Sequence, residues 1–256
     1  MAYFEQTGRA SYRPTPHVGG AWDTEQQHVA PAMGLLLHAV ERHRDARRDD
    51  DLVPARLSYD IWGTVPLAEV EVEVHVVRPG RTIELVEAAL THAGRRVLTL
   101  RAWLLRRADT AGVAGTSVAD VPPPDEVPPW DPTSVWPGGF IASAEVRRTE
   151  HAPGRALAWV RTDQPLLDGV EVSPWARVAA ILDIANGTAV RADPRQVAFP
   201  NLDLTAHLLR EPEGGWLGLD TTVSFGGSGL GLTSSVLHDT AGPLGTLAQV
   251  LTVRPT

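Results

Sequence analysis

The chain of 256 residues contains no cysteine and no lysine, so all 23 of its basic residues are arginine. The absence of cysteine excludes disulfides, thiolate metal sites and a cysteine nucleophile. The absence of lysine excludes Schiff-base chemistry and a P-loop lysine. No apolar run is long enough to span a membrane, and the polar residues 1–13 lack the apolar core of a signal peptide. We therefore expect a cytoplasmic protein without a membrane span.

The sequence also lacks the features of several common kinds of functional site. The formal net charge of −8 argues against a nucleic-acid partner, because nucleic-acid binders usually carry a basic surface. The nine histidines form no HxH or HExxH arrangement, so no metal site is predicted. No GxSxG motif is present, which disfavours a serine-hydrolase elbow. The glycine-rich segment 226–229 lies between predicted strands and is interpreted as a hairpin turn, not as a phosphate loop.

A proline-rich segment divides the chain at residues 109–139. Its prolines, at 122–124 and 128–129, are incompatible with a helix or a sheet interior. The segment is also longer than an ordinary loop inside a compact domain. We interpret it as a crossover between two halves, 1–108 and 140–256, and expect it to lie along the surface.

The first half contains one predicted helix and several predicted strands. The helix is expected at 31–40, within an apolar stretch. Residues 68–77 alternate strictly between polar and apolar side chains, which is typical of a half-buried strand. Strands at 82–92 and 97–106 follow, and Ala93-Gly94 is expected to form the turn between them.

The second half repeats this order of elements. A strand pair is expected at 142–162, a helix at 173–188 and strands at 202–210, 215–225, 230–238 and 244–254. Ser173 and Pro174 suit the first positions of that helix. Residues 54–63 resemble 200–209, and residues 99–106 resemble 247–254, which supports an internal duplication. The expected class is α+β, with antiparallel sheets that pair edge to edge.

Three polar residues stand out in apolar surroundings. Asp183 lies at the edge of the apolar stripe of the second helix, either as a solvated flank or as a group held for chemistry. Asn201 immediately precedes an alternating strand. Gln249 lies inside the apolar last strand, where it either faces solvent or is buried and needs hydrogen-bond partners.

Together these patterns resemble the double-hotdog acyl-CoA thioesterases of the acyl-CoA thioesterase II type and their thioesterase-like relatives. The segments that carry the resemblance are LDIANG at 182–187, PNLDLTAHLLR at 200–210 and TLAQVLTVR at 246–254. The resemblance implies an α+β double hotdog, in which two antiparallel sheets each wrap around a central helix. It also implies self-association, and an acyl-CoA or acyl-carrier thioester as substrate. No cofactor is expected, because coenzyme A enters as part of the substrate.

Carried over onto this chain, the family's hydrolytic residues fall on Asp183, Asn201 and Gln249, with Asn201 at a position where well-known members have Thr. The expected reaction is attack by a water molecule on the thioester carbonyl. Asp183 would take the proton of the water or orient it, and the two amides would fix its position. A backbone N–H near a helix N-terminus is expected to stabilise the oxyanion.

The first half contributes substrate-binding candidates. Beside the alignments above, we take Arg56 and Arg101 as the first-half counterparts of Asn201 and Gln249, and neither can accept a hydrogen bond from water. We therefore expect one active site per chain. The two arginines either contact a coenzyme A phosphate or form salt bridges with the glutamate-rich strands.

Two rival functions stay open at this stage. His28, just before the first helix, could pair with Asp183 as in hotdog dehydratases, or it could be a packing residue. A non-catalytic acyl-binding or assembly protein is the second rival.

Overall fold

The computed structural model describes residues 1–256 and contains one large antiparallel sheet of thirteen strands. In spatial order the strands are β1 (Phe4–Gln6), β2 (Ser11–Pro14), β6 (Val70–Arg78), β7 (Ile83–His92), β8 (Arg95–Arg106), β4 (Leu52–Ile61), β13 (Asp203–Leu208), β16 (Gly242–Thr252), β15 (Leu230–Asp239), β14 (Leu217–Phe225), β11 (Arg155–Thr162), β10 (Ala144–Ala152) and β9 (Pro129–Trp130). Short two-stranded sheets join β3 (Gln26–Gln27) to β5 (Val65–Pro66) and β12 (Val197–Ala198) to β17 (Arg254–Pro255). A mostly antiparallel sheet with a few helices is an α+β fold, as the sequence predicts.

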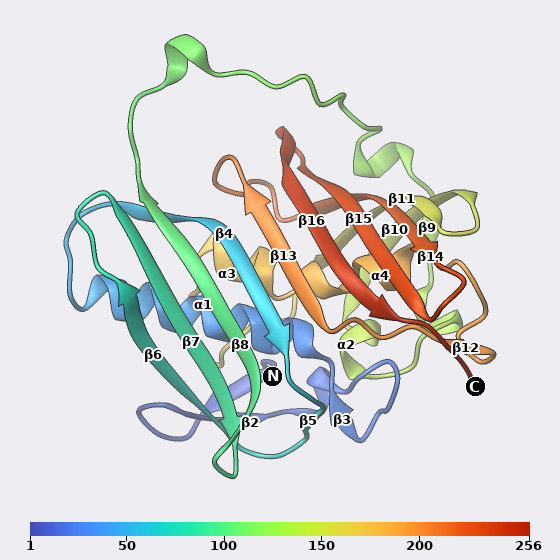
Figure 1. Cartoon of the computed structure of the whole chain (residues 1–256), viewed down its shortest axis with the longest axis horizontal. Coiled ribbons are helices and arrows are strands. Elements are labelled where there is room, and N and C mark those ends of the chain that lie inside the picture. Colours follow the sequence, from blue (N-terminus) through green and yellow to red (C-terminus); the bar gives the residue numbers. More distant parts are fainter.

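The two halves of the chain meet where β4 pairs with β13, so hydrogen bonding continues from one half into the other (Figure 1). One hydrophobic core also extends across both halves. The first residues of the chain cross to the second half as well, since the N–H of Tyr3 bonds the carbonyl of Pro165. No helix of the structure is both long enough and apolar enough to cross a membrane.

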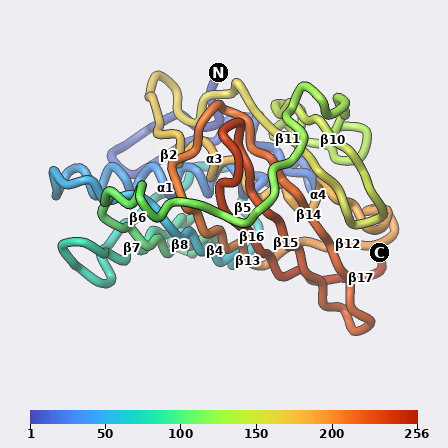
Figure 2. The backbone as a smooth tube through the Cα atoms, turned by 90° about the horizontal axis from the view of Figure 1, so that it is seen from above, coloured from blue at the N-terminus to red at the C-terminus, as the bar shows by residue number.

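The first helix, α1 (Val29–Asp45), packs against β6, β7 and β8 on one face of the sheet. His28 caps its N-terminus, and Arg42 and Arg44 lie in its last turn, where a positive charge complements the helix dipole. In Figure 2 the helices lie together on one side of β4, β8 and β13. A Cβ at Gly34 would stand 2.6 Å from the Cβ of Ala180, so the close contact between α1 and the second helical segment requires glycine.

The single helix predicted over 173–188 is wrong. The structure breaks it into α3 (Pro174–Ala179), a 3-10 turn η5 (Leu182–Ile184) and α4 (Ala185–Thr188). The N-terminus follows the expectation, since the Ser173 side chain accepts a bond from the N–H of Ala176. The break follows Ile181, and Asn186 and Gly187 in the last turn are poor helix formers. It sets Asp183 in the tight turn rather than on a continuous helix face.

The turns between strands follow their predicted chemistry. Ala93 and Gly94 have φ of 48° and 75°, the left-handed values that a tight two-residue turn between β7 and β8 requires. The glycine-rich segment 226–229 joins β14 to β15 as a hairpin.

The crossover segment only partly follows the expectation that it lies along the surface. Its first part, to about residue 120, is exposed and arcs away from the sheet (Figure 1). Its second part folds back, forms β9 and the short helix α2 (Gly139–Ala142), and buries side chains. Val127 and Trp136 are only 2% and 4% exposed. Apolar residues between the prolines supply this burial, which a composition rich in proline does not reveal.

Candidate functional site

The structure brings Asp183, Asn201 and Gln249 together from three separate elements. Asp183 comes from the turn η5, Asn201 from the residues before β13, and Gln249 from β16. The Oδ1 atom of Asp183 accepts hydrogen bonds from Nδ2 of Asn201 at 2.6 Å and from Nε2 of Gln249 at 2.9 Å. The second oxygen, Oδ2, accepts no hydrogen bond from the protein. One carboxylate oxygen is therefore held by two amides, and the other is available to a ligand or a water molecule.

Asp183 is 5% exposed, and no arginine bonds its carboxylate. Burial raises its pKa to about 7, the two amide hydrogen bonds oppose this shift, and the charge of Asp203 adds to it. A carboxyl group with a pKa near neutrality can exchange a proton with water at physiological pH, which is the property that a general base needs.

The amide of Asn201 is fixed from both sides. One hydrogen of its Nδ2 goes to Asp183 and the other to the backbone oxygen of Asp203, at 3.1 Å. Both donor positions of the amide are therefore used within the protein, and the Asn201 side-chain oxygen remains to accept a bond in the cavity that this residue lines.

Gln249 is 1% exposed and lies opposite Thr233 on β15. Its Oε1 atom and the Thr233 hydroxyl are both buried without a hydrogen-bond partner. Buried polar atoms without partners are uncommon, and here an acceptor and a donor face the same interior. The sequence does not single out Thr233, because Leu230 and Leu232, which alternate with it, are exposed in the structure, while Thr233 shares the buried face with Gly231 and Ser235.

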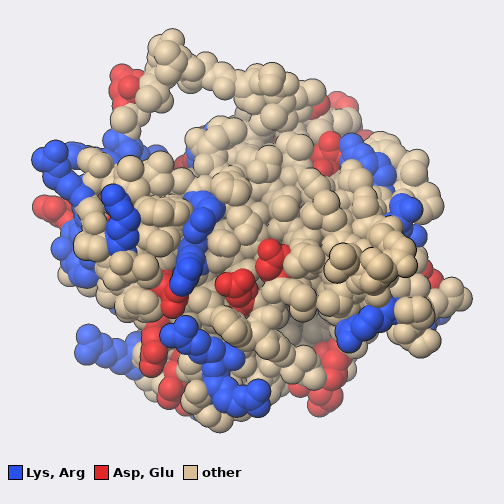
Figure 3. Space-filling view, in the orientation of Figure 1, with Lys and Arg blue, Asp and Glu red and all other residues tan.

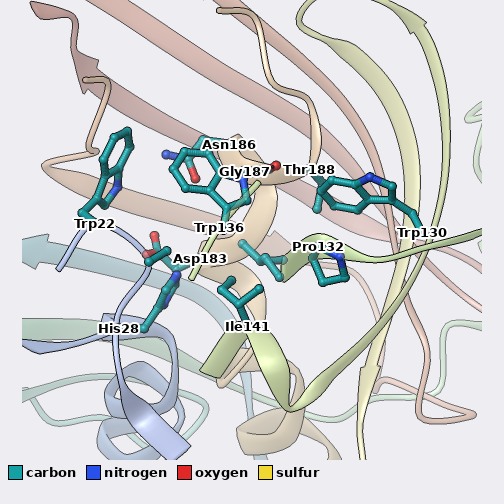
Figure 4. A pocket seen from close by; sticks show the side chains of 12 residues that line it. Trp22, His28, Trp130, Pro132, Trp136, Ile141, Asp183, Asn186, Gly187 and Thr188 are labelled. Atoms are coloured by element: carbon teal, nitrogen blue, oxygen red, sulfur yellow. Dashed lines mark hydrogen bonds between the residues drawn. The ribbon is translucent and has the colours of Figure 1, made fainter. Parts of the chain in front are cut away.

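His28 lies beside Asp183 at one end of the cavity shown in Figure 4. Its Nδ1 accepts a bond from the N–H of Ala30 at 3.2 Å, and its ring stacks at 4.3 Å on Phe140. Burial lowers the pKa of His28 to about 3, so the imidazole is neutral. Because Nδ1 accepts, the single ring proton belongs on Nε2, which makes no hydrogen bond within the protein.

Two cavities meet at Asp183 and His28. The larger, of about 440 Å³, opens to the surface and is also lined by Asn201, Trp62 and Arg254. The smaller, of about 20 Å³, leads inward. Its walls are mostly apolar and come from Trp22, Trp130, Pro132, Trp136, Ile141 and the segment 184–188 (Figure 4). Sequence analysis missed these tryptophans, because loop and crossover residues carry no periodic signal of burial.

The proposed substrate contacts of Arg56 and Arg101 find no support in the geometry, since neither residue lines either cavity. Nε of Arg101 donates to Glu87 at 2.8 Å, on the side of the sheet away from Leu100 and Ala102, which are fully buried. Glu87 lies on β7, so the salt-bridge alternative holds for Arg101. Arg56 forms no salt bridge, and its Nε is buried without a hydrogen-bond partner.

The assignment of Arg56 and Arg101 as mates of the catalytic candidates is also wrong. One constant shift along the chain carries the pair Val86–Ala102 onto Thr233–Gln249 and the pair Glu87–Arg101 onto Ser234–Ala248. By that shift the mate of Gln249 is Ala102, and the mate of Asn201 is Pro54. The two letter-by-letter alignments each miss the strand register by one position, and Arg56 lies one further position from the residue aligned with Asn201, which is Ala55. A slip of one position exchanges the faces of a strand.

Comparison with protein families gives two matches that lie side by side along the chain. The family model of the acyl-CoA thioesterase N-terminal domain matches residues 18–105. The model of the acyl-CoA thioesterase C-terminal domain matches residues 119–253, which include Asp183, Asn201 and Gln249. No curated protein sequence matches the chain.

Solved structures share the fold at low sequence identity. A putative thioesterase from Novosphingobium aromaticivorans is 22% identical with a TM-score of 0.75, and the match covers 99% of each chain. A hot dog fold protein of unknown function from Alicyclobacillus acidocaldarius is 18% identical with a TM-score of 0.77, over 97% of this chain and 95% of the other. The acyl-CoA thioesterase II TesB2 from Mycobacterium marinum is 16% identical with a TM-score of 0.68, over 99% and 96%.

Proposed function

The chain belongs to the acyl-CoA thioesterase family and is a thioester hydrolase, and we propose that it hydrolyses acyl-CoA at a water molecule held by Asp183, Asn201 and Gln249. The observation that carries this proposal is the different environment of the two carboxylate oxygens of Asp183. Its Oδ1 is fixed by two amides, while its Oδ2 is unoccupied by protein donors at the meeting point of two cavities.

In this mechanism the water oxygen attacks the thioester carbonyl carbon and passes a proton to Asp183. The carbon–sulfur bond then breaks, and the coenzyme A sulfur leaves as a thiolate that takes up a proton. The products are a carboxylic acid and free coenzyme A. A thiolate leaves readily, so no covalent enzyme intermediate is required. The pKa of about 7 suits Asp183 to accept the proton near neutral pH.

His28 is proposed as a substrate-binding residue that donates from Nε2 to the thioester carbonyl oxygen. Its neutral imidazole with the proton on Nε2 supplies a donor to the charge that develops on that oxygen. The same tautomer disfavours the dehydratase rival, because a base at Nε2 would need a free lone pair there.

The proposed division into two hotdogs places residues 1–108 in the first, 109–139 in the crossover and 140–256 in the second. In this layout each half of the sheet wraps around its own helical segment, α1 in the first half and α3–α4 in the second. Support comes from the constant shift that relates strand pairs β7–β8 and β15–β16.

The test of the function is a thiol-release assay over a panel of acyl-CoA substrates. Hydrolysis by the parent protein, lost in Asp183→Asn and kept in Asp168→Asn, is the expected result. Asp168 is an exposed loop carboxylate that lines neither cavity, so it controls for the loss of one negative charge. Normal hydrolysis by Asp183→Asn would remove this residue from the mechanism.

Self-association is proposed through the outer face of β15 and β16. Their outward side chains carry no charge, and Leu230 and Leu232 are 65% and 51% exposed. Figure 3 shows the contrast between this uncharged area and the charged face of the first half. Exposed apolar patches favour association. We expect a dimer or larger assembly by light scattering, weakened by Leu232→Lys. A parent protein that is monomeric at micromolar concentration would contradict the proposal.

A further inference from the structure

A thioester held at Asp183 has two arms, and the two cavities that meet there differ greatly in size. The coenzyme A arm is long and carries phosphates and a nucleotide, so it requires the open cavity of about 440 Å³, where Arg254 supplies a cation. The acyl arm is left with the inward cavity of about 20 Å³. This step rests on the proposed function, because it takes the thioester carbonyl to lie at Asp183.

Aromatic side chains form one wall of the smaller cavity, in which Trp136 is 4% exposed and Trp22, at the rim, is 45% exposed. The rings of Trp22 and Trp136 meet edge to face at 4.9 Å. Phe199 completes the group, with ring centroids 5.2 Å from Trp22 and 5.8 Å from Trp136. Such edge-to-face contacts are favourable for aromatic rings, and they interlock the three side chains. The cavity is therefore bounded by a packed aromatic wall.

The crossover segment supplies the far side of this wall and is anchored to the second half. The Trp136 indole N–H donates to the carbonyl oxygen of Gly187 at 3.0 Å. The guanidinium of Arg148 lies 4.7 Å over the ring of Trp130, and β9 pairs with β10. Moving either tryptophan away would break these contacts, so the wall resists displacement by a ligand.

The size of the inward cavity limits what fits behind Asp183. A cavity of 10–15 Å³ on this scale holds about one water molecule, and apolar cavities that bind benzene measure roughly 150 Å³. A volume of about 20 Å³ therefore admits one or two carbon atoms beyond the thioester carbonyl. A longer chain or an aromatic acyl group would have to displace packed side chains, which is unfavourable in a closed interior.

We propose that the substrates are short-chain acyl-CoA thioesters, with acyl groups of up to about three carbons, and that Trp136 of the crossover segment sets this limit. Trp136 is a specificity-determining residue in this scheme. It shapes the cavity without contributing to proton transfer.

The experiment measures kcat/KM for acetyl-, butyryl-, hexanoyl-, decanoyl- and palmitoyl-CoA. In the parent protein we expect the highest value at about three carbons or fewer and a value at least tenfold lower for decanoyl-CoA. Trp136→Ala should move the maximum by several carbons toward longer chains. Trp136→Phe loses the bond to Gly187 but keeps most of the wall, so it should shift the maximum little.

Trp103→Ala is the matched control, because this tryptophan lies on β8, beside Arg78, and lines neither cavity. It should leave the chain-length profile unchanged. If Trp136→Ala fails to fold, Trp130→Ala tests the same wall from β9. An unchanged profile in every folded variant of the wall would overturn the role of the crossover segment.

Binding of non-hydrolysable S-alkyl coenzyme A thioethers separates this inference from the proposed function. Calorimetry should show affinity that falls beyond short alkyl chains in the parent protein and extends to longer chains in Trp136→Ala. A chain-length limit without any hydrolysis would contradict the proposed function and keep the inference. Hydrolysis with a preference for decanoyl- or palmitoyl-CoA would overturn the inference and keep the function.

Discussion

The two halves of the sheet pair their strands alike but bury different side chains. The inner positions Val74, Ala88, Val86 and Ala102 of the first half correspond by one constant shift to Thr221, Ser235, Thr233 and Gln249 of the second. All four polar residues of the second half are at most 2% exposed. Burying polar groups costs stability unless they find partners. The polar residues therefore occur in the half where a buried carboxylate needs partners.

The outer faces show the opposite contrast. In the first half, Glu87 and Arg101 face each other across β7 and β8 as an ion pair. In the second half, the corresponding positions carry Ser234 and Ala248. At these strand positions the second half thus has polar inner side chains and uncharged outer ones, while the first half has apolar inner side chains and charged outer ones. This comparison predicts different consequences for changes made in each half.

The largest effect is expected from Asp183→Asn, which removes the carboxylate around which the polar interior of the second half is arranged. The variant keeps the shape of the side chain and loses the base, so kcat should fall by roughly 10²–10⁴-fold. KM should change little, because Asp183 acts on the water molecule. Steady-state kinetics measure kcat and KM. A kcat within a few-fold of the parent would show that Asp183 takes no part in proton transfer.

The pH dependence follows from the raised pKa of Asp183. Activity requires the carboxylate, so kcat should rise with pH around a midpoint near 7 and level off above it. Stability has the opposite sign. Between about pH 4 and 7 the native state holds a proton that the unfolded state has lost, so the free energy of unfolding falls as pH rises through this window. Asp183→Asn should therefore gain thermal stability relative to the parent as pH rises across that window.

The next largest effect is expected from Gln249→Ala, which gives the second half the residue found at Ala102 in the first. Gln249 lines neither cavity, so the variant acts through Asp183 and loses one of the two hydrogen bonds that hold its Oδ1. We expect kcat to fall by about 10–10²-fold and the midpoint of its pH profile to move upward, because that bond lowers the pKa of Asp183. Combined with Asp183→Asn, the change should add little, since both act on one water. If kcat of the double variant fell by the product of the two single losses, the two residues would act independently and not on one water molecule.

A smaller effect is expected from Thr233→Val, which copies Val86. The hydroxyl of Thr233 and Oε1 of Gln249 are buried on paired positions of β15 and β16, and neither has a hydrogen-bond partner in this structure. We expect the hydroxyl to bond Oε1 in the substrate complex, which would keep the NH₂ of the amide toward Asp183. Losing it should lower kcat by about 2–10-fold without loss of stability. The control pair Thr221→Val and Ser235→Ala copies Val74 and Ala88, and these two hydroxyls bond each other at 2.7 Å. An equal loss of kcat in the control would show a general effect of polarity.

The sequence predicts the strands well because alternation reports directly on a half-buried sheet, as in residues 70–78. It also identifies Gln249, since a polar residue in an apolar strand requires an explanation. It does not reveal strand register, so Arg101 is matched to Gln249 and placed on the wrong face. It also cannot show the break after Ile181, because local propensity contains no information about the bonds that hold Asp183.

The smallest effect is expected on the charged exterior of the first half. The Arg101 side chain is about half exposed, and only 8% of the Glu87 side chain is exposed. A second arginine, Arg96, lies 3.4 Å from Glu87. Solvent screens the exposed Arg101 end of this pair, so Arg101→Ala should lower the free energy of unfolding by about 1 kcal/mol, near the upper end of the range for exposed pairs. Arg96 keeps the Glu87 carboxylate paired and limits the loss. Hydrolysis and the KM for acyl-CoA should be unchanged, because Arg101 lines neither cavity. A severalfold rise in KM that high salt mimics in the parent would instead place a coenzyme A phosphate on this face. That outcome would extend the substrate-binding surface of the first half from His28, at the cavities, to the outer face of the sheet.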